Sequence, residues 1–421
     1  MYFFIFHHRR VSQVTENLKN FFLPRGFDRS VGVLSLVLFI NEFGRSVVTV
    51  FLPIYLLVDL HATYLAVGFT LALLTGTSAF FQSVGGVLAD SWGRKKTMIR
   101  SSTIRLSIII SLVGFSFLAP SFLIISLLII VSEALNGILL TSTNAMVADV
   151  VKTGRRVEAY GLYRAASNFG YTLGALFGGM IVFFPEAFLI WSLVALANLL
   201  IMFIFVRESN NVVRASFRIT SILSASRDRT LLLFALVSVG AGMVGNQMGP
   251  TFTLYSTQYI GITKDQVGFL NSLNGIIVTI FQFGFSRLAL KHKLSTLMAV
   301  SVLIQGTGFL FVGFSPTFVA LEAIVVYITI GEMLQAPTGT AFSAAIAPET
   351  KRGEYIGFYS WGLNSGSALS PLLGGILLSA FSSSPTNIWY VIFIVGVLCF
   401  IAYVFVGKIA RSSYPKLTND L

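Results

Sequence analysis

Charged residues are scarce in this chain of 421 residues. Only 11% of its residues are Asp, Glu, Lys or Arg, against about 25% in an ordinary globular protein, while 55% are hydrophobic. A soluble protein this apolar could not cover its surface with polar groups, so the solvent around most of the chain must be lipid. Intrinsic disorder and a coiled coil are excluded by the same composition.

Other rare residue types exclude particular chemistries. Cys399 is the only cysteine, so no disulfide can form within the chain. The four histidines (His7, His8, His61 and His292) fall in the N-terminal tail or in expected loops, so no membrane span offers a pair of haem ligands, a metal cluster or a histidine-based catalytic site. The sequence also lacks a G-x-x-x-x-G-K-[ST] loop, which excludes an ATP-driven pump. We therefore expect neither an enzyme nor a cofactor.

Twelve apolar runs are long enough to cross a membrane, since about 20 such residues span about 30 Å of hydrocarbon. The sequence therefore predicts an all-α integral membrane protein with twelve transmembrane helices. We place them at 31–58, 64–89, 98–119, 121–150, 159–184, 186–206, 231–260, 264–289, 294–314, 317–347, 355–381 and 388–407. The apolar run that opens the chain is too short, and on the wrong side of its charges, for a cleaved signal peptide, and we expect it to lie at the membrane interface.

The basic residues fall almost entirely on one side of these spans. With the N-terminus inside, 25 of the 29 Lys and Arg residues lie on inner segments, and Lys264 alone lies on an outer loop. Arg45, Arg105 and Arg164 lie within spans. Because basic residues gather in cytoplasmic loops, both termini are predicted to be cytoplasmic, in the plasma membrane. The net charge of +12 thus fixes orientation, and no nucleic-acid partner is expected.

The two halves of the chain resemble each other. At an offset of 200, the triplet at 67–69 matches that at 267–269, and at an offset of 196 eight residues between 156 and 179 recur between 352 and 375. Six spans separate the copies, so they begin on the same side and form two parallel six-helix repeats. We expect a cytoplasmic segment at 1–30, an N-terminal half at 31–206, a cytoplasmic linker at 207–230, a C-terminal half at 231–407 and a cytoplasmic tail at 408–421. Such a duplication favours a binding site between the halves and alternating access by rocking.

The loop after the second expected helix reads GVLADSWGRKK at residues 86–96. It resembles the signature loop of the major facilitator superfamily, G-x-L-A-D-R-x-G-R-[KR]-[KR], and the likeness to that superfamily extends over essentially the whole chain. Gly86 would allow close helix approach, and Gly93 a tight turn. Ser91 stands where the family usually has Arg. The resemblance implies a gating loop formed by Gly86, Asp90, Gly93, Arg94 and Lys95.

Small residues are regularly spaced in the fifth and eleventh spans. Residues 170–179 resemble the motif of the superfamily's proton-coupled antiporters, g-x-x-x-G-P-x-x-G-G, with Ala175 in place of the proline. The second copy keeps the proline. Generic packing of helices through small residues is the alternative explanation. The residues concerned are Gly170, Gly174, Gly178, Gly179, Pro371, Gly374 and Gly375.

Charged residues within spans are the strongest functional clues, because each costs about 3 kcal/mol near the bilayer centre. Glu42 and Arg45 lie three residues apart on one face of the first span, and Glu133 and Glu332 lie in the middle of the fourth and tenth. In the superfamily that the chain resembles, these spans line a central cavity, where a carboxyl group could take and release a proton. The alternative is a structural pair, such as Glu42 with Arg45.

The surroundings of two of these glutamates look alike. The sequences EALN at 133–136 and EMLQ at 332–335 read as repeat equivalents, once a three-residue difference in length is allowed. Many members of the superfamily carry an Arg where Glu133 stands, so another residue would have to supply that positive charge. Arg164 and Arg105 are the candidates, although we expect Arg105 to extend to the inner membrane interface.

Four amides are candidate contacts for a substrate. Asn136 and Gln335 each follow one of the mid-span glutamates by three residues, and Asn246 and Gln247 form a polar pair in the seventh span. Each could instead form hydrogen bonds with a neighbouring helix.

Together these features predict a secondary active transporter of the major facilitator type, similar to its twelve-helix proton-coupled multidrug antiporters. We expect proton-driven efflux of hydrophobic or amphipathic small molecules by alternating access, in a monomer whose partners are its substrate, protons and the lipid bilayer. The proton gradient would supply the energy. One alternative is an importer, symporter or facilitator of a metabolite such as a sugar or an organic acid. A transporter-like receptor or sensor is disfavoured, because the expected tails are too short for a regulatory domain.

Overall fold

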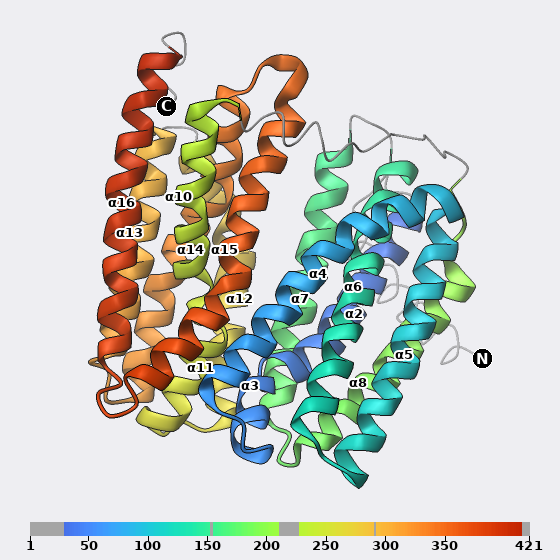
Figure 1. The fold of residues 1–421 in the computed structure, drawn as a ribbon. Coiled ribbons are helices and arrows are strands. Elements are labelled where there is room, and N and C mark those ends of the chain that lie inside the picture. Colours follow the sequence, from blue (N-terminus) through green and yellow to red (C-terminus); the bar gives the residue numbers. More distant parts are fainter. Residues whose placement is uncertain (1–28, 152–154, 210–226, 290–291, 415–421) are drawn as a thin grey trace, which may run out of the picture.

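The computed structural model describes residues 29–151, 155–209, 227–289 and 292–414 (Figure 1). Within these ranges the regular structure is entirely helical. The expected N-terminal segment, the C-terminal tail from residue 415 and most of the linker lie outside the described residues.

The helices form twelve membrane-crossing segments in the described ranges, as the sequence predicts. The N-terminal half contains α2 (Arg29–Thr49), α3 (Leu52–Ile54), η1 (Tyr55–Asp59), α4 (Tyr64–Trp92), α5 (Arg94–Leu118), α6 (Phe122–Val150), α7 (Arg156–Gly179) and α8 (Phe184–Phe205). The C-terminal half contains α10 (Arg229–Gly245), η3 (Asn246–Met248), α11 (Pro250–Tyr255), η4 (Ser256–Ile260), α12 (Lys264–Ala289), α13 (Leu294–Val312), α14 (Phe318–Ile346), η5 (Glu349–Lys351), α15 (Arg352–Ala380) and α16 (Asn387–Ser413). The short elements α3 and η1 continue α2, and η3, α11 and η4 continue α10.

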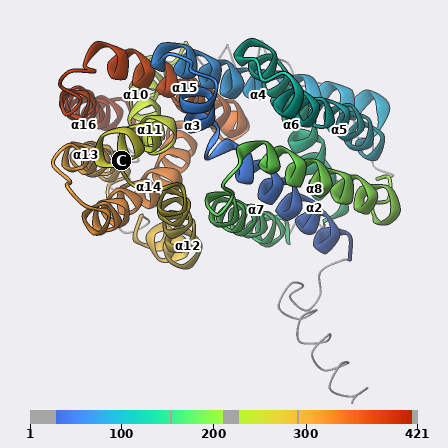
Figure 2. The same cartoon turned by 90° about the horizontal axis from the view of Figure 1, so that it is seen from below.

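The packing of the helices confirms the internal repeat. In the N-terminal half, α2 packs against α7, α4 against α6, and α5 against both α6 and α8. The equivalent pairs in the C-terminal half are α10 with α15, α12 with α14, and α13 with both α14 and α16. Figure 2 shows the two bundles side by side. Each half is therefore a compact unit with its own set of close helix contacts.

Ten of the twelve segments are apolar enough to cross a membrane on length and composition alone, and α7 and α15 are the two that are not. These two helices carry the repeated small and polar residues, and each packs against the other half, α7 against α12 and α15 against α4. The face of each helix that meets the other half is shielded from lipid, so it can carry polar residues. This explains why the hydropathy of α7 and α15 is lower than that of the other segments.

Glycines allow the closest helix approaches within each half. A Cβ on Gly170 would lie 2.3 Å from the carbonyl oxygen of Phe39, and one on Gly174 would lie 2.2 Å from that of Phe43, both on α2. Gly178 faces α2 in the same way. In the second half, Gly374 lies against Thr251 of α11. At these positions the glycine-rich motifs pack closely against neighbouring helices.

The halves also meet through glycine, at one end of the bundle. Gly68 near the start of α4 faces the backbone of Pro371 and Gly375 on α15, and Gly179 at the end of α7 faces the backbone of Lys264 and Asp265 on α12. We call this the far end; the opposite end, where α2 begins and α16 ends, is the basic end (uppermost in Figure 1). Backbone contacts therefore hold the two halves together at the far end.

Candidate functional site

The predicted gating loop is a single glycine between two helices. The helix α4 continues to Trp92 and α5 begins at Arg94, so Asp90 lies at a helix end, in the last turn of α4. Gly93 has a φ of 95°, a conformation that favours glycine. The Arg94 guanidinium bonds to the carboxylates of Asp90 and of Asp149 at the end of α6, the latter at 3.2 Å. The close helix approach predicted at Gly86 lies instead at its neighbour Gly85, whose Cβ would be 2.7 Å from the backbone of α6.

A carboxylate that the sequence did not point to holds this loop. Glu208, which follows α8, accepts hydrogen bonds from the backbone N–H of Lys95 at 2.9 Å and of Lys96 at 3.4 Å. Its carboxylate lies against Gly93, where a Cβ would be 3.0 Å away. The first N–H groups of a helix have no partner within the helix, and a negative charge is favoured there. Glu208 therefore caps α5 and fixes the start of the linker to the gating loop.

Glu42 and Arg45 form the structural pair that was one of the two predicted alternatives. The Arg45 guanidinium donates to the Glu42 carboxylate through Nη2 at 2.8 Å and Nε at 3.0 Å. The Glu42 side chain is 7% exposed and that of Arg45 is 24% exposed. Since both lie on α2 three residues apart, the pair forms within a single helix turn.

Arg105 is the counter-ion of Glu133, and its predicted position at the membrane interface is wrong. It lies eleven residues into α5, about 16 Å along the helix, and is 4% exposed. Its Nη2 lies 3.5 Å from Glu133 Oε1, and its guanidinium stacks over the ring of Trp191 at 5.3 Å. It also donates to Asn41 Oδ1 at 2.6 Å and to Ser132 Oγ at 3.3 Å. The length of α5 carries the side chain too deep to reach the interface.

Two asparagines join these ion pairs into one buried network. Asn41 donates to Glu42 at 3.2 Å and to Asn136 at 3.1 Å, and Asn136 donates to Glu133 at 3.4 Å. Asn136, a predicted substrate contact, thus bonds within its own half. The network contains two carboxylates and two guanidinium groups, so its net charge is zero when all four are ionised.

Glu332 is placed differently from Glu133. Its side chain is exposed, although it lies in the middle of α14, and its Oε2 accepts a hydrogen bond from Asn274 of α12 at 2.8 Å. Among the described residues, no Lys, Arg or His side chain lies within 4.0 Å of its carboxylate. Arg164 of α7 is exposed, and among the described ion pairs it joins neither Glu133 nor Glu332.

Helix lengths explain why the two glutamates differ. Both α6 (Phe122–Val150) and α14 (Phe318–Ile346) have 29 residues, and the same offset of 196 relates the starts of α7 and α15. At this offset Glu133 corresponds to Thr329, and Glu332 to Asn136. The equivalence inferred from EALN and EMLQ is therefore three residues out of register.

Two asparagines of α12 bond to different helices, Asn274 to Glu332 of α14 and Asn271 to Tyr171 of α7. Asn274 also donates to Thr329 Oγ1 at 3.0 Å, and the Tyr171 hydroxyl donates to Asn271 Oδ1 at 3.4 Å. The hydrogen bond between Tyr171 and Asn271 therefore joins α7 of the N-terminal half to α12 of the C-terminal half, three residues from Asn274. No motif in the sequence singled out these three residues.

The other predicted substrate contacts bond to neighbouring helices. Asn246 donates to the carbonyl oxygen of Ser367 at 2.9 Å, and Gln247, which is fully buried, donates to that of Ser370 at 3.2 Å. Both bonds tie the break in the seventh span to α15. Gln335 accepts a hydrogen bond from Gln305 of α13 at 2.9 Å. In this structure these side chains therefore form hydrogen bonds with neighbouring helices, which is the predicted alternative to contact with a substrate.

Comparisons with known proteins point to one family. The family model described as Major Facilitator Superfamily matches residues 34–263 and 231–420. The uncharacterised MFS-type transporter YttB of Bacillus subtilis (strain 168) is 28% identical over 365 residues, which are 84% of this chain and 89% of that protein. The multidrug resistance protein MdtH of Edwardsiella ictaluri (strain 93-146) is 24% identical over 350 residues, 79% of this chain and 82% of that protein.

A solved structure shares the fold. The nucleoside transporter NupG superposes with a TM-score of 0.76 at 14% sequence identity, covering 90% of this chain and 100% of that one. At this identity the likeness shows the fold alone. Because the family model accounts for the chain from residue 34 to residue 420, and the structure has the two repeated six-helix halves, the protein is a multi-pass membrane protein that belongs to the Major Facilitator Superfamily.

Proposed function

We propose that this protein is a proton-driven secondary transporter that exports hydrophobic or amphipathic small molecules. The observation that carries the proposal is the contrast among its three mid-span glutamates. Among the described residues, Glu42 and Glu133 are each paired with an arginine, whereas Glu332 accepts a hydrogen bond from the amide of Asn274 on α12, the helix that packs against α7 of the other half.

The pairing decides which carboxylate exchanges a proton. At 3.5 Å, opposite unit charges attract each other by about 5 kcal/mol at an effective dielectric constant of about 20. Protonation of Glu133 would forfeit this attraction and leave the buried charge of Arg105 uncompensated, and the same argument holds for Glu42 with Arg45. Protonation of Glu332 instead removes a negative charge that no adjacent cation compensates. Glu332 is therefore the carboxyl group that binds and releases the proton.

The position of Glu332 links that proton to movement of the halves. We propose that the basic end faces the cytoplasm, because it collects the lysines and arginines of the loops. The backbone contacts of Gly68 and Gly179 close the far end in this structure and would separate when the halves rock. A proton entering from outside would then reach Glu332 and later be released inward. Each proton contributes about 2.3 kcal/mol per 100 mV of membrane potential, in addition to the pH difference.

The proposed cargo is amphipathic, because fixed charge is scarce on the chain and the described hydrogen-bond partner of Glu332 is an amide. The printed name of the MdtH relative, a multidrug resistance protein, supports export of such compounds. The protein would act as a monomer, with the two halves of one chain forming the site.

Export of a fluorescent amphipathic dye from cells tests the proposal. Cells with the wild-type protein should retain less dye than cells without it, and a protonophore should abolish the difference. Glu332→Gln should behave like the empty cells. Glu322→Gln on the same helix is the matched control, since Glu322 lies near the far end of α14, and should export normally. Export that survives both the protonophore and Glu332→Gln would refute proton coupling.

A further inference from the structure

The two halves meet along two seams, which the internal repeat relates to each other. The helix α7 packs against α12 in one seam and α15 packs against α4 in the other, at opposite edges of the boundary between the bundles (Figure 2). The offset of 196 relates α7 to α15, and the offset of 200 relates α4 to α12. The two seams can therefore be compared residue by residue.

In the α7–α12 seam, one face of α12 stays closed against α7 over two helical turns. Gly268, Ser272 and Gly275 lie on this face, at spacings of four and three residues, and all three are buried. The Ser272 hydroxyl donates to the carbonyl oxygen of Thr172 on α7 at 2.8 Å, and shares its proton with the Gly268 carbonyl of its own helix. A Cβ on Gly275 would meet the Thr172 side chain. Close packing therefore continues to Thr172, seven residues or about 10 Å along α7 from Gly179 at the far end.

The equivalent face of α4 does not stay closed against α15. At the offset of 200 its residues are Gly68, Ala72 and Thr75, of which Gly68 is buried and the other two are half-buried. Ala72 cannot donate a hydrogen bond, and the Thr75 hydroxyl donates within α4, to the carbonyl oxygen of Leu71 at 3.0 Å. Ala368 of α15, which stands at the bonding position of α7, is also half-buried. Among the described residues, no side-chain hydrogen bond joins α4 to α15.

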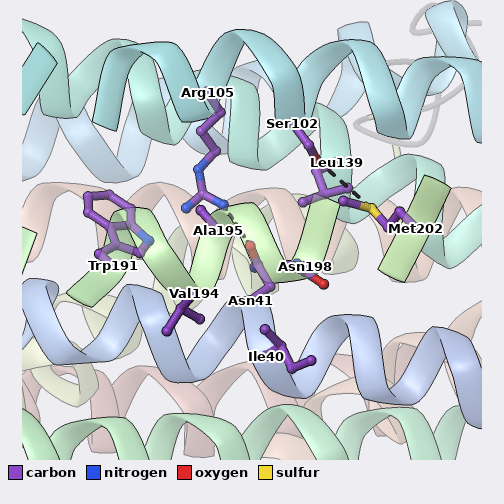
Figure 3. Close-up of a pocket in the computed structure, with 10 residues that line it drawn as sticks. All are labelled: Ile40, Asn41, Ser102, Arg105, Leu139, Trp191, Val194, Ala195, Asn198 and Met202. Atoms are coloured by element: carbon purple, nitrogen blue, oxygen red, sulfur yellow. Dashed lines mark hydrogen bonds between the residues drawn. The ribbon is translucent and has the colours of Figure 1, made fainter. Parts of the chain in front are cut away.

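The interior of the N-terminal half is held together by buried polar contacts. Arg105 of α5 donates to Asn41 of α2 and lies over the ring of Trp191 of α8 (Figure 3). Hydrogen bonds are stronger in a low-dielectric interior than in water, so such contacts keep the helices of one half together. We therefore expect the halves to move relative to each other at their seams.

We infer that Thr172 and Ser272 form the pivot on which the two halves rock, and that the far end opens mainly between α4 and α15. Lipid can replace an apolar contact but cannot donate or accept a hydrogen bond, so the α4–α15 seam separates more readily. The Ser272 hydroxyl already bonds in part to its own helix, so the pivot can turn without leaving that hydroxyl unpaired. The opening is therefore one-sided, and the path that it exposes is lined by α4 and α15.

Distances between spin labels at equivalent positions of the two seams test the inference. The full-length protein first needs Cys399→Ser, because Cys399 is its only cysteine. One pair of labels is attached at 180 and 265, beside the α7–α12 seam, and the other at 376 and 65, beside the α4–α15 seam. The offsets of 196 and 200 relate the two pairs, and all four positions are exposed.

A methyl group placed near the far end acts as a wedge in each seam. Gly68→Ala would bring it 2.5 Å from the carbonyl oxygen of Pro371 on α15, and Gly268→Ala would bring it 2.6 Å from that of Ala175 on α7. In Gly68→Ala the α4–α15 labels should move apart by more than the α7–α12 labels do. In Gly268→Ala the α7–α12 labels should stay close and the unfolding midpoint should fall. If Gly268→Ala does not fold, Gly68→Ala decides alone.

Three results would overturn the pivot. They are equal movement of both pairs in Gly68→Ala, no movement of its α4–α15 pair, and an α7–α12 pair that lengthens in Gly268→Ala as much as the α4–α15 pair does in Gly68→Ala. These distances do not depend on transport, so the pivot and the proposed export can fail separately.

The hydroxyl of the pivot has its own test. Adding Ser272→Ala to Gly68→Ala should let the α7–α12 labels move apart as well. Adding Thr75→Ala is the matched control, because that hydroxyl bonds within α4, and it should leave both distances as they are in Gly68→Ala alone. Unchanged α7–α12 distances after Ser272→Ala would contradict the role of the hydroxyl.

Discussion

The ion pair between Arg105 and Glu133 yields the sharpest prediction about stability. Its two side chains are 5% and 3% exposed, and their charged atoms lie 3.5 Å apart. Their attraction is about 5 kcal/mol at an effective dielectric constant of about 20. Removing one partner of such a buried pair typically costs about 3–5 kcal/mol, because the other charge is left without compensation. We therefore expect Glu133→Gln and Arg105→Gln each to destabilise the protein by several kcal/mol.

The double variant distinguishes an ion pair from two independent contributions. Once one charge is gone, removing the other relieves an uncompensated charge, so the double variant should be destabilised by much less than the sum of the single variants. Unfolding midpoints in detergent, together with the yield of folded protein, measure this coupling. Additive effects of the two substitutions would refute the pairing.

A second ion pair serves as the matched control. Arg155 and Glu158 lie closer together, at 3.1 Å, but their side chains are 38% and 60% exposed. Solvent screening reduces such a pair to about 0–1 kcal/mol. Glu158→Gln should therefore leave the midpoint almost unchanged, although it breaks the shorter contact. If it destabilises the protein as much as Glu133→Gln does, burial is not what gives the Arg105 pair its strength.

Three further predictions follow from close contacts. Gly170→Ala would place a methyl group 2.3 Å from a carbonyl oxygen of α2 and should lower the free energy of unfolding by about 1–3 kcal/mol. Gly161→Ala on the same helix is the control, because a methyl group there meets nothing within 4 Å and should not lower the unfolding midpoint. Equal midpoints for the two variants would contradict the packing. Glu208→Ala should cost about 1 kcal/mol and speed hydrogen exchange at the first amides of α5, and unchanged exchange would argue against the cap. Gly68→Ala would place a methyl group 2.5 Å from a backbone oxygen of α15, so spin labels across the far end should move apart; an unchanged distance distribution would contradict the contact.

The sequence was informative wherever the bilayer itself imposes a requirement. Lipid demands spans of a fixed length and tolerates few charges, so the twelve helices and their repeat could be predicted from hydropathy and spacing. The glycine motifs of α7 and α15 were likewise recognisable as packing positions, because helices approach closely only where side chains are small. Gly93 was recognisable as a turn.

Pairings between distant side chains were not accessible in the same way. Whether Arg105 reaches the inner interface or faces Glu133 depends on the rotation of α5, which hydropathy does not fix because polar residues are spread along this helix. Glu208 lies 113 residues from the amide that it caps, and no local pattern marks it. The likeness of EALN and EMLQ predicted the wrong register between the two repeats. Four similar residues define the register less well than the equal lengths of α6 and α14 do.

The central claim is that Glu332 alone couples the proton to the substrate. Transport by purified protein in liposomes with an imposed pH difference tests it most directly. Glu332→Gln mimics the protonated carboxyl group, so it should still carry substrate down its own concentration gradient but should not accumulate it against that gradient. The wild type and Glu322→Gln should do both. Accumulation by Glu332→Gln that depends on the pH difference would contradict the account.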